Sequence, residues 1–335
     1  MIPRPCSEPE DDALRSVAIA LQERGYAVDV EEFGSRPSGD PWLAAYAGLA
    51  VVAVLSVYVV PVLTATLGAV AVVLHARDSE GRPLLRRHSC TGRNVVARSP
   101  AAPAPVLVVV APAEVVPSRF AERTQRALLV SLQSGMAAVA AGGAAAWVAE
   151  GETELPVSVA AGGAVAAAAV AALAIVLYGS GRPTTALRGT LDVLLRLAPE
   201  LRDDAVWLVA SGGRRAGMTG IQAFLDAHPE TGGAWWLNLE PAPGGEVYAV
   251  SEEGTWRERR ADRFLLGAAE QAGAGVRPCR AAPTDATVLL ARRRRALTLM
   301  VGAPAEGLRI ALATARAALA ERRWRPGSRR PEPAG

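Results

Sequence analysis

Residues 206–225 read VWLVASGGRRAGMTGIQAFL, and this stretch determines the fold class predicted for the chain. An apolar, β-prone run at 205–210 predicts a buried strand. The glycines that follow predict a turn, and residues 217–227 carry apolar side chains at helical spacing. The stretch therefore predicts a strand, a glycine-rich turn and a helix in direct succession.

Strands and helices alternate in the same way along much of the chain. We expect helices from Asp11 or Asp12 to Gly25 and over 183–197, 261–272, 285–291 and 306–323, and strands over 26–33, 94–97, 106–110, 234–239, 246–250 and 296–301. This alternation is typical of an α/β domain whose largely parallel sheet is covered on both faces.

Three stretches, residues 41–76, 127–149 and 155–181, contain no Asp, Glu or Arg. About 20 apolar residues of helix cross a hydrocarbon core roughly 30 Å thick, so the last two predict a membrane hairpin over 127–181. The first, over 41–77, is long enough for two short spans that meet near Pro61 or for one tilted, kinked helix. With two spans there, four transmembrane helices in two hairpins interrupt the domain.

On this interpretation the α/β domain is discontinuous, with parts at 1–40, 78–126 and 182–325, and residues 326–335 form a disordered basic tail. Arginines flank the hairpins on the domain side, whereas the turn at 150–154 carries only glutamates as charged residues. Positively charged loops stay on the cytoplasmic side. We therefore expect an integral protein of a bacterial-type plasma membrane with its α/β domain in the cytoplasm. Small residues at 140–144 and 160–164 also predict close packing of the last two helices.

The net charge of +3 comes from arginine, because the sequence contains no lysine. The arginine runs at 292–295 and 322–330 are interpreted either as solvated helix ends or as contacts for anionic lipid headgroups. No pattern of stacking aromatic residues supports nucleic-acid binding. The expected partners are therefore the bilayer and an unidentified protein. The three cysteines, Cys6, Cys90 and Cys279, are far apart, and in a reducing cytoplasm we expect no disulfide.

Several common sites are excluded by the residues present. The turn at Ser211 and the two following glycines lacks the lysine and hydroxyl of a phosphate-binding P-loop. His88 and Cys90 have no second pair of ligands to complete a zinc site, and the nucleophile motif Gly-x-Ser-x-Gly does not occur. The apolar stretches hold no charged side chain, which argues against a transporter.

Four stretches carry a family likeness. GRNVVA (92–97) followed by VLVVVA (106–111) is similar to a strand reading N-V-I-A and the strand that delivers a first ligand motif. LLRLA (194–198) is similar to the end of a helix in a known family. Residues 206–225 are similar to a strand, turn and helix that read V-x-F-x-x-F-x-A-E-E-x-G-L-x-G-S-x-x-F. WLNLE (236–240) lies where x-x-N-L-D is expected. In this order they resemble the di-zinc exopeptidases, which include aminopeptidase Y, bacterial leucyl aminopeptidases and glutamate carboxypeptidase. The resemblance implies a phosphorylase/hydrolase-like zinc-exopeptidase sandwich, an α/β fold with a mostly parallel central sheet.

The resemblance places the family's catalytic machinery on residues of other types. The family's general base and a neighbouring metal ligand, both glutamates, fall on Arg214 and Arg215, so no catalytic residue is expected. Zinc binds imidazole, thiolate or carboxylate, and two guanidinium groups repel a cation. We therefore expect no metal and no other cofactor. The family's metal-ligand positions fall on Pro112, Glu114, Ala186, Arg215, Glu240 and Ala286.

The residues that remain would form a vestigial pocket of Glu114, Arg214, Arg215, Glu240 and Asp285. The arginines either pair with the two glutamates, which turns a metal centre into a salt-bridge cluster, or face solvent in a loop. The predicted function is that of a membrane-anchored pseudoenzyme that binds or scaffolds without catalysis. The alternative is an active membrane-bound zinc aminopeptidase or carboxypeptidase that recruits its metals through other residues.

Overall fold

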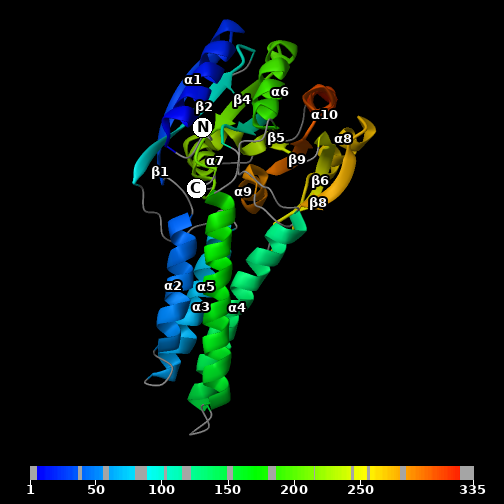
Figure 1. Ribbon diagram of the computed structural model, residues 1–335. Coiled ribbons are helices and arrows are strands. Elements are labelled where there is room, and N and C mark those ends of the chain that lie inside the picture. The colour runs from blue at the N-terminus through cyan, green and yellow to red at the C-terminus, as the bar shows by residue number, and fades with distance from the viewer. Residues whose placement is uncertain are drawn as a thin grey trace, which may run out of the picture.

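A nine-stranded sheet runs through the α/β part of the protein, as the computed structural model shows (Figure 1). The structure describes residues 6–36, 40–55, 60–79, 89–101, 104–114, 122–148, 154–179, 186–214, 216–242, 245–254, 257–279 and 284–324. The predicted disordered tail at 326–335 lies outside these residues.

The strands lie in the order β1-β2-β4-β3-β5-β9-β6-β7, and β8 pairs with β6. The central strands β4, β3, β5 and β9 are parallel, and antiparallel pairs flank them on both sides. The prediction of a mostly parallel sheet is therefore wrong, because the sheet is mixed. The strands are β1 (Ala27–Ser35), β2 (Cys90–Arg98), β3 (Leu107–Pro112), β4 (Val206–Ser211), β5 (Trp235–Pro241), β6 (Val247–Glu253), β7 (Arg259–Arg260), β8 (Gly275–Cys279) and β9 (Arg295–Val301).

Helices cover both faces of this sheet, and the strand residues alternate between the two faces. In β3, Leu107 and Val109 pack on one face with helices α1 (Glu8–Glu23), α6 (Ala186–Leu201), α8 (Arg263–Gln271) and α10 (Pro304–Trp324). Val108 and Val110 pack on the other face with α7 (Thr219–Ala227) and α9 (Asp285–Ala291). Because side chains of a strand point alternately to opposite faces, an unbroken apolar run such as β3 is what a sheet covered on both sides requires.

Four further helices pack together into a bundle that projects away from the sheet (Figure 1). They are α2 (Asp40–Leu55), α3 (Pro61–Ser79), α4 (Glu122–Val148) and α5 (Glu154–Gly179). Glycines bring their backbones close: a Cβ at Gly163 of α5 would lie 2.6 Å from the carbonyl oxygen of Gly135 in α4. A Cβ at Gly142 of α4 would lie 2.8 Å from the Cβ of Ala160 in α5. The predicted close packing of α4 and α5 is confirmed, although Gly143 contacts α3 instead.

Within the part of the chain that the structure describes, no helix combines the length and apolarity needed to cross a bilayer. The predictions of four transmembrane helices and of an integral membrane protein are therefore wrong. Helix α2 has 16 residues, about 24 Å at 1.5 Å per residue, which is shorter than a hydrocarbon core.

A disulfide joins Cys6, just before α1, to Cys90 at the start of β2. Their Cα atoms are 6.1 Å apart although 84 positions separate them in sequence. The prediction of unpaired cysteines is therefore wrong. It missed that α1 packs on β2, which brings the beginning of the helix to the beginning of the strand.

The arginine run at 292–295 is partly used inside the protein. Arg292 donates to Asp226 at 2.5 Å, and Arg295 donates to Asp262 at 2.9 Å. The Arg295 guanidinium also lies 3.8 Å from the ring centroid of Trp235. Two arginines of the run are thus engaged in contacts within the protein, and the binding of lipid headgroups by the run stays a prediction. The side chains of the second run, 322–330, lie outside the described residues.

Candidate functional site

The carboxyl ends of the parallel strands β3, β4 and β5 meet at one edge of the sheet. In the register of the sheet, Pro112 at the end of β3 lies opposite Ser211 at the end of β4. Glu114 follows β3, the glycine-rich turn follows β4, and Glu240 is the penultimate residue of β5. In open α/β sheets this edge is where ligands bind, so it is the first place to look for a functional site.

Arg214 contacts two buried carboxylates at this edge. Its Nη1 lies 2.9 Å from Glu240 Oε2, and the two side chains are 9% and 0% exposed. Its backbone N–H donates to Glu114 Oε1 at 3.1 Å. Arg214 thus points into the protein and not into solvent. Arg215 lies outside the described residues.

Asp285 completes this edge from the first turn of α9. Its Oδ2 accepts a hydrogen bond of 2.5 Å from the Ser211 hydroxyl. Burial raises the pKa of Asp285, although the hydrogen bond from Ser211 and the charge of Arg214 act in the opposite direction. Sequence reasoning treated Ser211 only as a turn residue. Its position opposite Pro112 in the register is a tertiary fact that no local motif reveals.

A fourth buried carboxylate, Glu253, lies at the end of β6 and was not predicted. Its Oε2 accepts from Thr284 Oγ1 at 2.5 Å and from Thr287 Oγ1 at 3.0 Å. Thr284 is also the N-cap of α9 and forms a capping box with Thr287. Burial raises the pKa of Glu253 against these hydrogen bonds. A signal existed in the Glu252-Glu253 pair at the end of an alternating strand, where one of two adjacent side chains must point inward.

The cluster carries more negative than positive charge. Burial raises the pKa of Glu240 to about 7; Arg214 acts against this rise, and the charge of Asp285 adds to it. Within this cluster, Glu240 Oε2 has the Arg214 guanidinium as its contact, whereas the buried atoms Arg214 Nε, Asn238 Oδ1 and Asp285 Oδ1 have no hydrogen-bond partner among the described residues. The last two are acceptors, and a proton on a carboxyl group supplies a missing donor. The cluster is therefore suited to hold a proton near neutral pH.

The residues at this edge do not fit a zinc ion. Where the resemblance expects a histidine, the structure has Pro112, buried at the end of β3, and a second expected histidine falls on Ala286, buried in α9. Ala186 is the first residue of α6 and offers no ligand atom. Glu240 already pairs with a guanidinium. Over the described ranges, no group of three or more His, Cys, Asp or Glu side chains is arranged to hold a metal.

The turn that presents Arg214 is fixed by side chains from other elements. Asn94 of β2 accepts from the Gly212 N–H at 3.1 Å and donates to the Gly220 carbonyl at 3.0 Å. Glu10 of α1 accepts from the Gly213 N–H at 3.0 Å. Gly213 has φ of +65°, a conformation that glycine adopts readily. These two amides are therefore engaged inside the protein, which agrees with the absence of a phosphate-binding loop.

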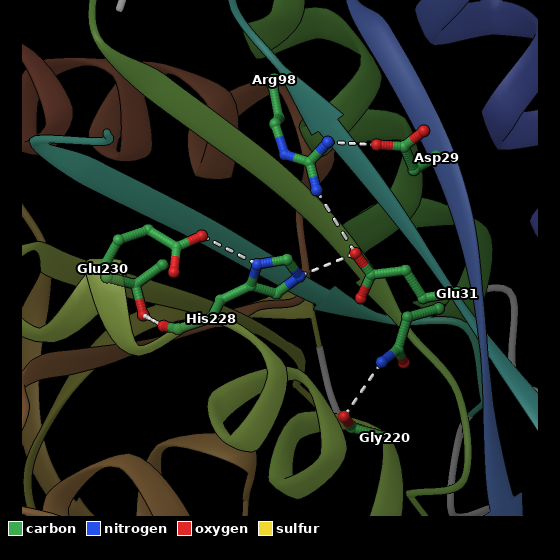
Figure 2. A network of polar contacts seen from close by, with 8 residues as sticks. Asp29, Glu31, Arg98, Gly220, His228 and Glu230 are labelled. Carbon is green, nitrogen blue, oxygen red and sulfur yellow. Dashed lines mark hydrogen bonds and ion pairs between the residues drawn. The ribbon is translucent and has the colours of Figure 1, made fainter. Parts of the chain in front are cut away.

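A second polar network holds the far end of α7 to the edge strand β1 (Figure 2). His228 lies between two carboxylates, with Nδ1 2.9 Å from Glu230 and Nε2 2.7 Å from Glu31. Glu31 also lies 3.5 Å from Arg98 of β2. A neutral imidazole has one N–H, so both contacts are hydrogen bonds only when the ring is protonated. The helix that follows the Arg214 turn is thus fastened at both ends.

No protein-family model matches this sequence, and no curated protein matches it. Solved structures do show likeness to it. A zinc aminopeptidase from Bacillus subtilis aligns with a TM-score of 0.45 and 10% identity, covering 96% of this chain and 91% of the other. An aminopeptidase from Aneurinibacillus sp. strain AM-1 aligns with a TM-score of 0.42 and 12% identity, covering 95% and 88%. A glutaminyl cyclase from Tannerella forsythia aligns with a TM-score of 0.42 and 11% identity, covering 94% of this chain and 91% of the other. Likenesses of this extent carry no argument about activity.

Proposed function

We propose that this chain is a non-catalytic, exopeptidase-like protein that acts by binding or scaffolding. The four exopeptidase-like stretches in the sequence support the family likeness. The observation that carries the loss of catalysis is the buried ion pair between Arg214 and Glu240, 2.9 Å apart. In the resemblance, the position of Arg214 belongs to the general base.

The ion pair opposes metal binding for two reasons. A guanidinium stays charged at all relevant pH values, so it repels a divalent cation that approaches Glu240. A metal would also have to displace Arg214, and breaking a buried ion pair by removing one partner costs about 3–5 kcal/mol. The pair therefore stabilises this edge without a metal.

The carboxylates that remain do not serve as a general base. Such a base must lie within hydrogen-bond reach of the water or substrate proton that it removes. Glu240 and Asp285 are both buried, at 0% and 1% exposure, so neither carboxyl group is open to a water molecule or substrate from solvent. The hydroxyl proton of Ser211 is already used in a hydrogen bond to Asp285.

The test is a metal and activity assay on the purified full-length chain. We expect no stoichiometric zinc by mass spectrometry of the metal content. We also expect no hydrolysis of leucine p-nitroanilide or of a peptide with a free carboxyl terminus, with added zinc or cobalt. Glu240→Ala should leave both results unchanged. Glu246→Ala is the matched control, because Glu246 is exposed and pairs with Arg277 at 2.6 Å.

One result would restore the alternative, a working zinc aminopeptidase or carboxypeptidase. In that result, the wild-type protein hydrolyses the substrate and a chelator stops the hydrolysis. Glu240→Ala abolishes the hydrolysis, whereas Glu246→Ala does not. Arg214→Glu gives a second check. Because Pro112 and Ala186 also lack the ligand atoms that the family has there, a restored carboxylate alone should bring back neither zinc nor activity.

A further inference from the structure

The first turn of α1 reaches the glycine-rich turn of the site through one buried carboxylate. Glu10 is fully buried. Its Oε1 accepts from the Gly213 N–H at 3.0 Å, and its Oε2 accepts from the Cys6 N–H at 2.6 Å. Gly213 directly precedes Arg214, the residue that pairs with Glu240. Glu10 therefore links the backbone of Cys6 to the site turn by two hydrogen bonds.

Cys6 is held in place by its disulfide with Cys90. Its φ is +58°, in the left-handed region that a residue with a side chain adopts only when its surroundings enforce it. The disulfide anchors Cys6 to the first residue of β2, the strand that also supplies Asn94 to the site turn. Without this bond, we expect the backbone of Cys6 to relax to a negative φ.

The disulfide is open to attack by a thiol. Cys6 and Cys90 are each partly exposed, neither fully buried nor fully exposed. Thiol–disulfide exchange requires access of a thiolate to one sulfur, and two partly exposed residues are where such access is expected. The third cysteine, Cys279, is buried in β8 and belongs to a different apolar cluster.

The rest of α1 is anchored independently of the disulfide. Leu14, Val17 and Leu21 pack in the main core, and Asp11 pairs with Arg93 of β2 at 2.6 Å. Loss of the disulfide should therefore free only the beginning of the helix, and with it the Cys6 contact of Glu10, while the helix stays on the sheet.

We propose that the Cys6–Cys90 disulfide is a redox latch on the site turn. A dithiol supplies two electrons and two protons, the S–S bond breaks, each sulfur becomes a thiol, and the dithiol closes to a cyclic disulfide. Cys6 then leaves its left-handed conformation, Glu10 loses one of its two backbone donors, and the turn that carries Arg214 loosens. The proposal concerns the position of the turn and holds whether or not the site is catalytic.

The experiment compares backbone amide exchange in the full-length protein before and after reduction with dithiothreitol. Peptides that cover residues 211–220 should exchange at least tenfold faster after reduction, while β9 changes less than twofold. Non-reducing peptide mapping reports the disulfide itself. Cys279→Ser is the matched control and should respond to dithiothreitol as the wild type does.

Two variants separate the latch from a general effect on stability. Cys6→Ser/Cys90→Ser should show fast exchange at the turn and no response to dithiothreitol. Glu10→Gln keeps the disulfide but weakens its link to Gly213, so the turn should exchange fast in both redox states. If the double variant does not fold, reduced wild type and Glu10→Gln still give the comparison. Unchanged exchange at 211–220 on reduction, or an equal increase in β9, overturns the proposal.

Discussion

The sheet and the four-helix bundle are packed by opposite means. Large side chains fill the sheet core, where Trp236 is fully buried and meets Phe224 edge to face at 5.9 Å between ring centroids. In the bundle, small residues let the helix backbones come close, because a Cβ at Gly163 would lie 2.6 Å from the Gly135 carbonyl oxygen. Removing volume should therefore harm the sheet most, and adding volume should harm the bundle most.

The largest expected effect is the loss of volume in the sheet. Trp236→Ala should lower the free energy of unfolding by about 3–5 kcal/mol, since it removes a buried ring and leaves a cavity. The matched control is Trp147→Ala in α4, where the ring is 65% exposed and a change below about 0.5 kcal/mol is expected. Urea denaturation measures both. Equal losses in the two variants would break the comparison.

The next effect concerns the pH dependence of stability. Because the pKa of Glu240 is raised to about 7 from 4.5, the native protein holds a proton that the unfolded chain has released. This contribution is fully present below pH 4.5 and is lost as the pH rises through 7. One pKa unit corresponds to about 1.4 kcal/mol, so about 3 kcal/mol should be lost across this window.

Glu240→Gln should reduce this slope, and denaturant titrations at several pH values will show it; Asp285 and Glu253, whose pKa values burial also raises, contribute a slope of the same sign. Glu246→Gln, at the exposed pair with Arg277, should leave the slope unchanged. A free energy of unfolding that rises from pH 4.5 to 7 in the wild type, or a slope that is the same in Glu240→Gln as in the wild type, would contradict the assignment.

A smaller effect is expected from added volume in the bundle. Gly163→Leu should lower the free energy of unfolding by about 1–3 kcal/mol, because overpacking pushes the helices apart. Gly162 is the adjacent control: a Cβ there meets nothing within 4 Å, so Gly162→Leu should be neutral or slightly stabilising through helix propensity. Thermal unfolding of the two variants side by side gives the answer. If both behave alike, close backbone packing does not hold the bundle together.

The smallest effect is expected at the His228 network. His228→Gln should lower the free energy of unfolding by about 1 kcal/mol, since it loses a hydrogen bond that joins the end of α7 to β1. Amide exchange in β1 should increase at the same time. Glu230→Gln is a milder comparison, because Glu230 makes its contact within the same turn. An undisturbed β1 in His228→Gln would show that the network does not fasten this strand.

Elements in the parallel core are predictable because burial on both faces leaves a clear local signal. Helix α9 begins and ends as predicted, at Asp285 and Ala291, and β4, β5 and β9 lie within one or two residues of their predicted bounds. The short strands β7 and β8 at the edge were missed. Four of the five residues of β8 are exposed, so no apolar pattern marks it.

Contacts between residues far apart in the sequence could not be predicted, because they leave no local pattern. An apolar, uncharged helix has the same composition in a bundle as in a membrane, so the stretches at 41–77 and 127–181 were misinterpreted. Glu10 follows the N-cap of α1 like any acidic first-turn residue, yet it is buried against Gly213. The pairing of Arg214 with Glu240 was open to prediction only because the family likeness aligned both with one site.

The two helical hairpins also bear on how the chain finds its fold. One hairpin separates β1 from β2, which pair with each other in register from Ala27 with Arg98 to Ser35 with Cys90. The other separates β3 from α6. A hairpin that forms early returns the chain close to where it left, so it shortens the loop that strand pairing must close. Since α2 contacts α5 and α3 contacts α4, docking of the two hairpins would draw together the parts of the sheet that they interrupt.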